Sequence, residues 1–234
     1  MSIQLPRRGH LPRTGPVDAI DQYYTPVLGA FFRRRLAWVD AALPPGPLGR
    51  VLEIGYGSGV FQYTLAPRAR LSVGLDIHPF GAKVRRRLAE DGIAATLLQG
   101  DGCVLPFAGG SFDVVVILSA LEFVPDPAAC LDEAVRVLAP GGRVVCIRPR
   151  VLPWADAIYG QLVGFDPEAE FQGGRQRVQA ALARVRAPQR RLARPAWLPP
   201  ALAPYEVVVL ETPARRRVAG ASPVGGLGGL ALGT

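Results

Sequence analysis

The sequence feature that most constrains the fold is a glycine-rich segment directly after a short apolar run. Residues 50–60 read RVLEIGYGSGV, with Glu53 inside the apolar run and glycines at positions 55, 57 and 59. An apolar run of this length indicates a strand buried on both faces of a parallel sheet. Glycine has no Cβ, so the chain can turn tightly and a ligand can approach the main chain. The segment therefore predicts an α/β protein with a ligand site at the end of its first strand.

The spacing of these glycines disfavours a nucleotide-dependent oxidoreductase. The dinucleotide fingerprint G-x-G-x-x-G places a pyrophosphate at a helix N-terminus. Here Gly59 follows Gly57 after a single residue, and Glu53 lies two places before the first glycine. A carboxylate at that place repels a pyrophosphate and suits a ligand that carries a cationic amine.

Two further acidic residues follow predicted strands. Residues 71–75 form a second apolar run that ends at Asp76, and residues 95–99 form a third strand that leads to Asp101. In open α/β sheets ligands gather at the carboxyl ends of the strands. A carboxylate at position 76 can accept hydrogen bonds from both hydroxyls of a ribose, and one at position 101 can accept the amine of an adenine. The alternative role for Asp76 is a helix N-terminal cap.

The chain from about residue 50 to residue 150 resembles the class I S-adenosylmethionine-dependent methyltransferases, and within them the type 11-like small-molecule group that includes the quinone-pathway C-methylating enzymes. The segments that carry the resemblance are VLEIGYGSG, GLDIH, QGDGCVLPF, GSFDVVVILSALEFVPD and EAVRVLAPGGRVV. The sequence departs from the group at Phe123, where a histidine often follows the glutamate, and at Gly102, where alanine is usual. The first departure bears on acceptor chemistry that relies on that histidine.

The resemblance implies the fold, the cofactor and a set of binding residues. The expected fold is a Rossmann-like, mostly parallel sheet of seven strands in the order 3-2-1-4-5-7-6, with the last strand antiparallel and helices on both faces. The expected cofactor is S-adenosylmethionine, with no metal. Its expected binding residues are Glu53, Gly55, Tyr56, Gly57, Gly59, Asp76, Ile77, His78, Asp101, Gly102, Leu118 and Ser119.

The 234 residues suit one α/β domain. We expect a mobile N-terminal arm (1–16), a single methyltransferase domain (17–212) and a disordered tail (213–234). Within the domain we expect an N-terminal helical cap (17–49), a cofactor-binding core (50–150), a helical insert on the acceptor side (151–189) and a closing hairpin (190–212).

The acceptor and the catalytic residues are left open by the sequence. Methyl transfer to an O, N or C atom of a small molecule needs a base only where the acceptor must lose a proton. Weak candidates for that base are Tyr23, Tyr24, His78, Glu122, Asp166 and Glu170. One of the two tyrosines is an alternative cover for the cofactor, and Glu122 is more simply explained as an anchor at a helix start.

Charge leaves a second question open. The formal net charge is +8, and between Arg175 and Arg217 there are ten arginines against two glutamates. Such a balance fits an anionic partner, namely RNA, a phosphorylated metabolite or a membrane surface, and it fits equally a solvated arginine-rich face. If the arginines cluster beside the cleft, an anionic acceptor is favoured. The alternatives to a small-molecule enzyme are an RNA methyltransferase, which is not favoured, and a cofactor-binding module without catalysis.

Other classes of protein are disfavoured by what the sequence lacks. The three cysteines are isolated and form no C-x-x-C pair, so neither a disulfide framework nor a zinc site is expected. Residues 118–121 read LSAL, which argues against enzymes that methylate the amino groups of DNA bases. The absence of a signal-peptide pattern and of a long apolar run predicts a cytoplasmic protein with no transmembrane segment.

Overall fold

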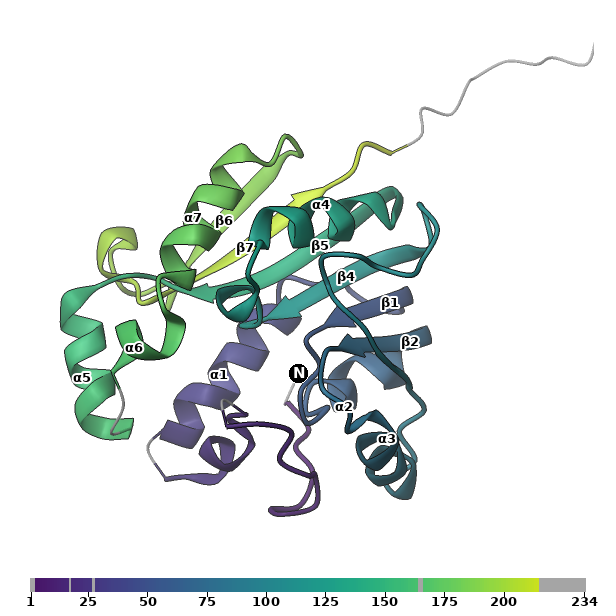
Figure 1. Cartoon of the computed structure of the whole chain (residues 1–234), viewed down its shortest axis with the longest axis horizontal. Helices are drawn as coiled ribbons and strands as arrows, with labels where there is room; N and C mark the ends of the chain where they lie inside the picture. The colour runs from purple at the N-terminus through teal and green to yellow at the C-terminus, as the bar shows by residue number, and fades with distance from the viewer. Residues whose placement is uncertain (1–2, 17, 27, 164–165, 215–234) are drawn as a thin grey trace, which may run out of the picture.

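The computed structural model describes residues 3–16, 18–26, 28–163 and 166–214. Within them lies a seven-stranded sheet of order β3-β2-β1-β4-β5-β7-β6 (Figure 1). Strands β1 to β5 pair in parallel, and β7 runs antiparallel to both β5 and β6. The predicted strand order and the antiparallel last strand are confirmed. The strands are β1 (Gly49–Ile54), β2 (Ala69–Asp76), β3 (Thr96–Gln99), β4 (Phe112–Leu118), β5 (Leu138–Pro149), β6 (Gln189–Arg194) and β7 (Tyr205–Glu211).

Helices cover both faces of the sheet, as predicted. The α-helices are α1 (Leu28–Asp40), α2 (Gln62–Leu65), α3 (Gly81–Glu90), α4 (Pro127–Arg136), α5 (Pro153–Val163), α6 (Pro167–Phe171) and α7 (Gly174–Arg184), and the 3-10 turns are η1 (Ile20–Tyr24), η2 (Ala66–Arg68), η3 (Leu121–Phe123) and η4 (Pro200–Leu202). Side chains of α1, α2 and α3 share one buried cluster with Val114 and Val116 of β4. Side chains of α4 and α7 share the other cluster with Val115 and Ile117. Successive residues of β4 therefore face opposite layers, which is why the strand is apolar almost throughout.

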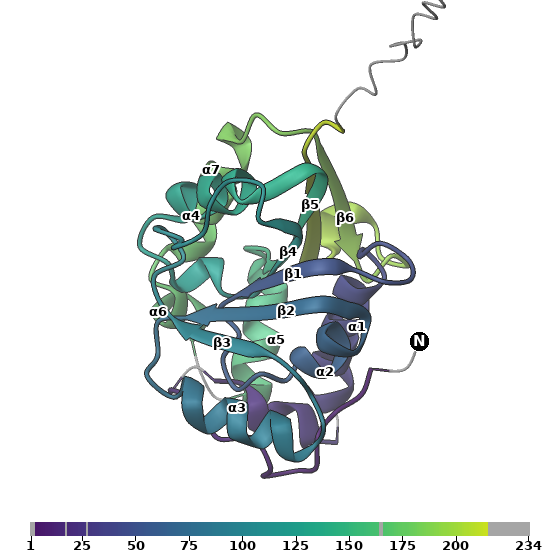
Figure 2. The ribbon, with the colours of Figure 1, turned by 90° about the vertical axis from the view of Figure 1, so that its right-hand side faces the viewer.

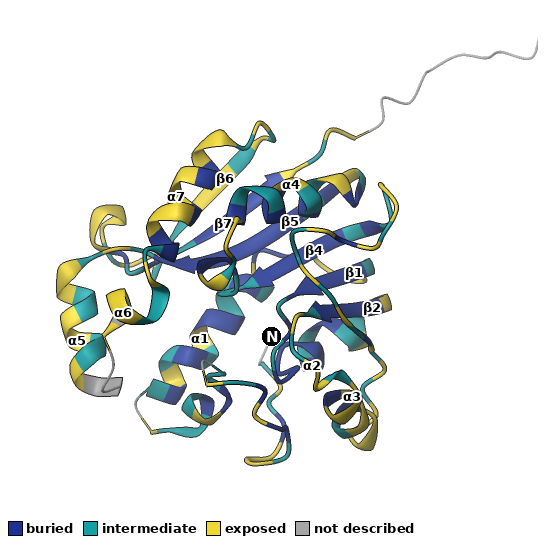
Figure 3. Ribbon diagram, in the orientation of Figure 1, coloured by how far each residue is buried: buried dark blue, intermediate teal, exposed yellow. Residues whose placement is uncertain are grey.

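Burial is concentrated in the central strands. Figure 3 shows β1, β4 and β5 largely buried, while the outward faces of α3, α6 and α7 are exposed. Across the described part of the chain, no helix combines the length and the apolar character that a membrane crossing needs.

The strand order creates a place for a ligand between β1 and β4. From β1 the chain continues to β2 on one side, while β4 pairs with β1 on the other (Figure 2). The connections diverge at this point, so they leave a crevice outside the carboxyl ends of the strands. Helices α5 and α6 lie beyond that end of the sheet (Figure 1). Segments that are distant in sequence thus meet around one opening.

Several boundaries differ from the predicted ones. The predicted helical stretch from residue 17 to residue 43 is divided into η1 and α1, with Pro26 between them, because proline lacks the N–H that a continuous helix needs. Strand β5 begins before Gly141 instead of after it. Gly141 has a φ of +80°, and the register between β4 and β5 shifts between Phe112 and Val114. The Pro140–Gly142 segment is therefore an irregular start of β5.

The N-terminal segment packs against the domain. Leu11 is buried in the same cluster as α1, and His10 Nε2 lies 3.0 Å from the carbonyl oxygen of Arg87 on α3. The Tyr24 hydroxyl donates a 2.7 Å hydrogen bond to the carbonyl of Pro6. Residues 3–16, predicted to be a mobile arm, therefore make defined contacts, and their mobility stays a prediction. Most of the predicted disordered tail, residues 215–234, lies outside the described residues.

Candidate functional site

A single large cleft of about 1000 Å³ runs along the carboxyl ends of the strands. We call one end the cofactor half and define it by Asp18, Glu53, Gly55–Ser58, Val60, Phe61, Asp76–His78 and Gly100–Gly102; the predicted binding residue Gly59 is not part of the lining. We call the other end the acceptor half and define it by Phe31, Trp38, Trp154–Asp156, Ile158, Tyr159, Phe171, Trp197, Leu198 and Tyr205. Arg35, Leu118 and Ser119 lie at the junction of the two. The volume is at the upper end of the ~300–1,000 Å³ usual for small-molecule sites.

The glycines of the loop after β1 have different tasks. Gly55 has a φ of +76°, and a Cβ at this position would lie 2.4 Å from the Cβ of Ala120. Gly59 has a φ of +82°, and its Cβ would lie 2.9 Å from Val84 of α3. At Gly57 the nearest atom to a Cβ is the Thr14 hydroxyl oxygen at 4.0 Å. Positions 55 and 59 thus need glycine for packing, whereas Gly57 leaves open space at the main chain.

Glu53 is buried at the base of the cleft with a defined partner. Its side chain is 2% exposed, and its Oε2 accepts a 2.6 Å hydrogen bond from Gln62 Nε2. Gln62 in turn accepts a 2.7 Å hydrogen bond from the hydroxyl of Ser72 on β2. Burial raises the pKa of Glu53 to about 8. Gln62 is not among the residues expected from the sequence, although a glutamine within the apolar stretch FQYTLA is a signal for a buried polar group.

Asp76 lies at the tip of β2 and faces the glycine loop. Its Oδ2 accepts a 2.8 Å hydrogen bond from the main-chain N–H of Gly57. His78 Nε2 lies 2.9 Å from the carbonyl oxygen of Gly57, and its Nδ1 lies 3.2 Å from the N–H of Phe80. The tautomer with the proton on Nε2 satisfies both contacts. Both ring nitrogens of His78 are then in use, so we assign His78 to holding the loop and not to proton abstraction.

The remaining predicted cofactor residues also line the cleft. Ile77 is 73% exposed beside Asp76. Asp101 accepts a 2.8 Å hydrogen bond from the N–H of Cys103. The Tyr56 ring packs edge-on against His78 with centroids 4.9 Å apart, which leaves its main chain for ligand contact. A Cβ at Gly102 would lie 2.9 Å from Ile54, so the local packing accounts for glycine where the resembling group has alanine.

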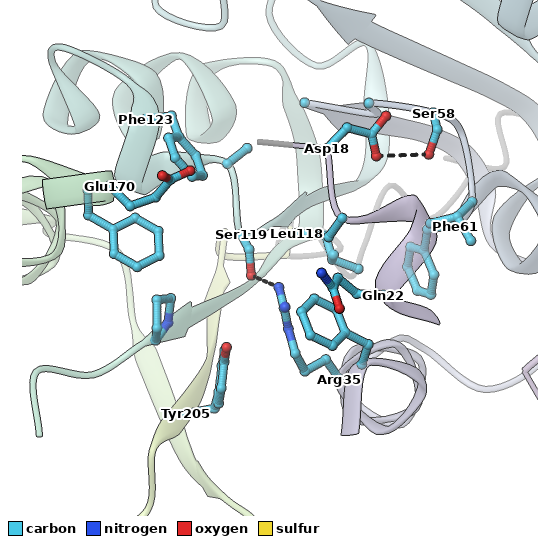
Figure 4. Close-up of a pocket in the computed structure, with 18 of the residues that line it drawn as sticks. Asp18, Gln22, Arg35, Ser58, Phe61, Leu118, Ser119, Phe123, Glu170 and Tyr205 are labelled. Carbon is cyan, nitrogen blue, oxygen red and sulfur yellow. Dashed lines mark hydrogen bonds between the residues drawn. The ribbon is translucent and has the colours of Figure 1, made fainter. Parts of the chain in front are cut away.

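The three predicted acids, Glu53, Asp76 and Asp101, therefore line one cleft from three adjacent strand ends. Their contact with a ligand stays a prediction. A fourth acid that was not expected from the sequence, Asp18, also lines the cleft and accepts hydrogen bonds from the N–H and hydroxyl of Thr14. The Ser58 hydroxyl donates to Asp18 at 3.4 Å, as Figure 4 shows, so the N-terminal segment is attached to the glycine loop.

The junction contains an unusual pair of side chains. Ser119 has a φ of +52°, a conformation that non-glycine residues adopt at a cost, and its hydroxyl accepts a hydrogen bond from Arg35 Nη2 (Figure 4). Arg35 is 7% exposed, although it belongs to a run of three consecutive arginines, Arg33 to Arg35. Helix α1 buries this one arginine of the run, while Arg34 lines the cleft from an exposed position.

The acceptor half is lined mainly by aromatic and aliphatic side chains. Trp154, Ile158 and Tyr159 come from α5, Trp197 from the β6–β7 connection and Tyr205 from the start of β7. Trp197 is 75% exposed at the rim. Among the described arginines from residue 175 onward, only Arg175 lines the cleft, and it is paired with Asp156 at 2.6 Å. The described C-terminal arginines thus do not cluster at this half, so they lend no support to an anionic acceptor.

The candidate bases differ in access to the cleft. Tyr23, His78 and Glu170 line it. Burial raises the pKa of Tyr23 to about 12, so this tyrosine stays protonated. Tyr24 donates to Pro6, and Asp166 caps α6 by accepting from the N–H of Glu168 at 2.9 Å.

Glu122 is fully buried on η3 and is not part of the cleft lining. Burial raises its pKa to about 7, and neither carboxyl oxygen has a hydrogen-bond partner within the described ranges. Those ranges also contain no group of acidic, histidine or cysteine side chains that fits a metal ion.

The strand order, the glycine loop and the acids at the strand ends define a class I methyltransferase fold. Residues 52–146 match the family described as "Methyltransferase domain". A crystal structure of a Pyrococcus horikoshii protein superposes with a TM-score of 0.61 at 16% identity, covering 84% of this chain and 96% of that one, which shows the fold alone. Residues 52–146 are thus similar to the methyltransferase family, and the strand order is that of the class I methyltransferase fold.

Two curated relatives match the same core. The chain is 38% identical over 122 residues to a demethylmenaquinone methyltransferase of Thermus thermophilus, which is 51% of this chain and 55% of the relative. It is 35% identical over 124 residues to a ubiquinone/menaquinone biosynthesis C-methyltransferase of a Ruegeria species. The aligned region covers 50% of this chain and 50% of that relative. The chain thus spans about half the length of the curated relatives it matches.

Proposed function

We propose that this protein transfers a methyl group from S-adenosylmethionine to a small-molecule acceptor. The observation that carries the proposal is a single cleft in which an acidic, glycine-lined half is continuous with an aromatic half. The relatives named as quinone-pathway methyltransferases support a small acceptor with a large apolar surface. The acceptor atom, O, N or C, stays open.

The residues of the cofactor half fit S-adenosylmethionine. Gly57 leaves room at the main chain, and the Asp76 carboxylate next to it is placed to accept from ribose hydroxyls. Asp101 would accept from the adenine amine, Asp18 presents negative charge to the ammonium, and the carboxyl group of Glu53 offers an oxygen that accepts from it. When bound, the cofactor supplies an electrophilic methyl group on a sulfonium.

The contribution of the chain itself is positioning and exclusion of water. Holding two reactants in line contributes about 7–11 kcal/mol to lowering a barrier. The segment around Asp18 closes the cofactor half from one side, and the aromatic side chains of the acceptor half replace water around an apolar acceptor. Tyr23 remains protonated at neutral pH, so it can donate a hydrogen bond to an acceptor oxygen but cannot act as its base.

The direct test is to incubate the purified chain with methyl-labelled S-adenosylmethionine and fractionated cell extract. We expect label in a small-molecule fraction that depends on the protein. Label in RNA, with binding that weakens steeply as salt rises, would instead support the RNA methyltransferase alternative. Cofactor binding without labelling of any fraction would support the non-catalytic module.

Replacing Asp76 tests the cofactor half on its own. Asp76→Ala removes a charged acceptor, so affinity for S-adenosylhomocysteine in calorimetry should fall by about 1.5–3 kcal/mol. Asp76→Asn keeps an oxygen for the Gly57 N–H and should lose less. Asp132→Ala, an exposed aspartate on α4, is the matched control and should bind as wild type. Unchanged affinity in Asp76→Ala would contradict the assignment of the ribose site.

A further inference from the structure

Helix α5 is apolar on nearly every side and yet lies at the surface. Its sequence, PWADAIYGQLV, contains one charged residue, Asp156, which pairs with Arg175 at 2.6 Å. Over residues 153–161 the exposed positions are Pro153, Trp154, Ala157, Ile158 and Gln161. A helix of this composition is usually covered, so its exposure indicates a surface that a partner covers.

A second uncharged segment lies next to α5. The connection from β6 to β7, residues 195–204, reads PAWLPPALAP and contains no charged residue. Trp197 in this connection is 75% exposed, and Leu202 is 48% exposed. The main-chain N–H of Arg150 donates to the carbonyl of Pro204 at 2.8 Å, so the connection ends beside the residues that lead into α5. Figure 1 shows the connection and α5 at the same end of the molecule.

These two segments border the opening of the acceptor half. Trp154 and Ile158 of α5 and Trp197 of the connection line the cleft and are exposed as well. We call the exposed surface of both segments, together with the residue before Leu152, the apolar rim. Its large exposed side chains are Val151, Trp154, Ile158, Trp197 and Leu202. Figure 3 shows exposed stretches on both segments. In a chain with 20% charged residues, an uncharged rim around a cleft marks an interaction surface.

Basic side chains flank the apolar rim. Strand β6, QRRLAR, leads into the connection with three arginines, and Arg190 among them is exposed. On the opposite side of the cleft, Arg34 of α1 is exposed and belongs to the lining. Two of the acids on α5 and α6, Asp156 and Glu168, are paired with Arg175. The apolar rim therefore lies between exposed positive charges, in a chain whose formal net charge is +8.

We propose that the apolar rim docks onto the surface of a membrane that contains anionic lipids, with Trp154 and Trp197 at the boundary between headgroups and acyl chains. Tryptophan prefers this boundary, and arginines beside it are attracted to anionic headgroups. The contact is peripheral, because α5 has 11 residues and a membrane-spanning helix needs about 20.

The position of the rim favours lipid over a protein partner. A protein that covered the rim would close the acceptor half, whereas a lipid surface leaves it open to apolar compounds dissolved among the acyl chains. The proposal does not depend on the proposed function, because binding to a membrane needs neither the cofactor nor the acceptor.

The test is sedimentation of the full chain with vesicles of two compositions: phosphatidylcholine alone, and phosphatidylcholine mixed with phosphatidylglycerol. We expect stronger binding to the mixed vesicles, which weakens as salt rises, and a shift of tryptophan emission to shorter wavelengths. Leu202→Glu should lower the partition coefficient about 10-fold, because it removes an inserted side chain and adds a repelled charge. Val104→Glu changes a valine that is 73% exposed outside the cleft lining, and this matched control should bind as wild type.

A second variant tests the charge and replaces no apolar side chain. Arg190→Gln should weaken binding to the mixed vesicles about fivefold and leave binding to phosphatidylcholine alone unchanged. Arg85→Gln, which changes an exposed arginine on α3, is its matched control and should bind as wild type. Melting temperatures equal to that of wild type verify that the variants are folded.

Three results would overturn the proposal. The first is a wild-type protein that does not bind the mixed vesicles, and the second is equal weakening by Leu202→Glu and Val104→Glu. The third is a concentration-dependent dimer in sedimentation velocity that Leu202→Glu abolishes, which would assign the apolar rim to a second copy of the chain. None of these results bears on the proposed function, which the labelling of a small-molecule fraction tests without vesicles.

Discussion

The two halves of the cleft are assembled in different ways. Outside the N-terminal segment, the cofactor half comes from consecutive strand ends between Glu53 and Gly102, and its groups are fixed by short hydrogen bonds such as that from Gly57 to Asp76. The acceptor half combines side chains of α1, α5, α6 and the β6–β7 connection. Large apolar side chains on helices and loops can be exchanged without loss of the sheet, whereas a main-chain turn with fixed φ cannot. The residues of the cofactor half therefore lie close together in the sequence, and those of the acceptor half lie far apart in it.

The comparison with other proteins follows the same division. The family match covers residues 52–146, which contain the cofactor half except for its N-terminal segment. It ends before Trp154, Tyr159, Trp197 and Tyr205 of the acceptor half. The family match therefore bears on the cofactor half, while the acceptor half lies outside it, and function belongs to the site and not to the fold.

The largest effect on binding and stability should come from Gly55→Ala, which changes the turn after β1 in the cofactor half. The new Cβ would lie 2.4 Å from that of Ala120 in a backbone with φ +76°. Overpacking and the left-handed conformation together should cost about 2–5 kcal/mol. We expect loss of measurable S-adenosylhomocysteine binding in calorimetry and a lower melting temperature.

Gly57→Ala is the matched control for the loss of stability in this variant. Within the chain its Cβ would meet open space apart from Thr14 at 4.0 Å, so only the left-handed backbone lowers the stability, by about 1–2 kcal/mol. If both variants lose the same melting temperature, the division of tasks within the glycine loop is wrong.

The local character of the cofactor half explains what could be predicted from sequence. The buried strand before Gly55 and the spacing to Asp76 lie within one βαβ unit, where sequence order and spatial order agree. Strand β4, Phe112–Leu118, can be recognised in the sequence because its apolar run is nearly uninterrupted. The cleft that joins Glu53, Asp76 and Asp101 follows from parallel strands ending at one edge.

What could not be predicted depends on contacts between distant segments. Arg35 meets Ser119 across 84 positions of sequence, and Asp18 meets Ser58 across 40. Nothing in a run of three arginines indicates which of them faces inward, since that is decided by the rotation of α1 on the sheet. The N-terminal segment contains few apolar residues. Its contact with α3 through His10 therefore could not be predicted from the local sequence.

A smaller effect is expected from the pH dependence of stability, and it separates two buried glutamates. The native pKa of Glu53 is about 8, above its unfolded value near 4.5. The native state therefore holds a proton that the unfolded state releases, and the contribution of Glu53 to the free energy of unfolding falls as pH rises from about 4.5 to about 8. Glu53→Gln should remove this slope in urea titrations, a change on the order of a few kcal/mol.

Glu122→Gln is the comparison variant outside the cleft lining. The native pKa of Glu122 is about 7. The Glu122→Gln variant should therefore remove a decrease in the free energy of unfolding with pH that ends near pH 7. A Glu53→Gln protein with the full wild-type slope up to pH 8 would show that Glu53 is ionised in the native state.

The smallest effect on the cofactor half is expected from a change in the acceptor half. Trp154 lies on α5, is 42% exposed and lines the cleft far from the glycine loop in sequence. Trp154→Ala should leave S-adenosylhomocysteine affinity within about twofold, because separated sites without shared partners are nearly additive. With the acceptor found by labelling, the same variant should raise KM by about 5- to 30-fold, since a partly buried aromatic contact contributes about 1–2 kcal/mol. If the affinity for S-adenosylhomocysteine fell by the same factor as KM rose, the two halves would be coupled. The division between local donor binding and distributed acceptor binding would then fail.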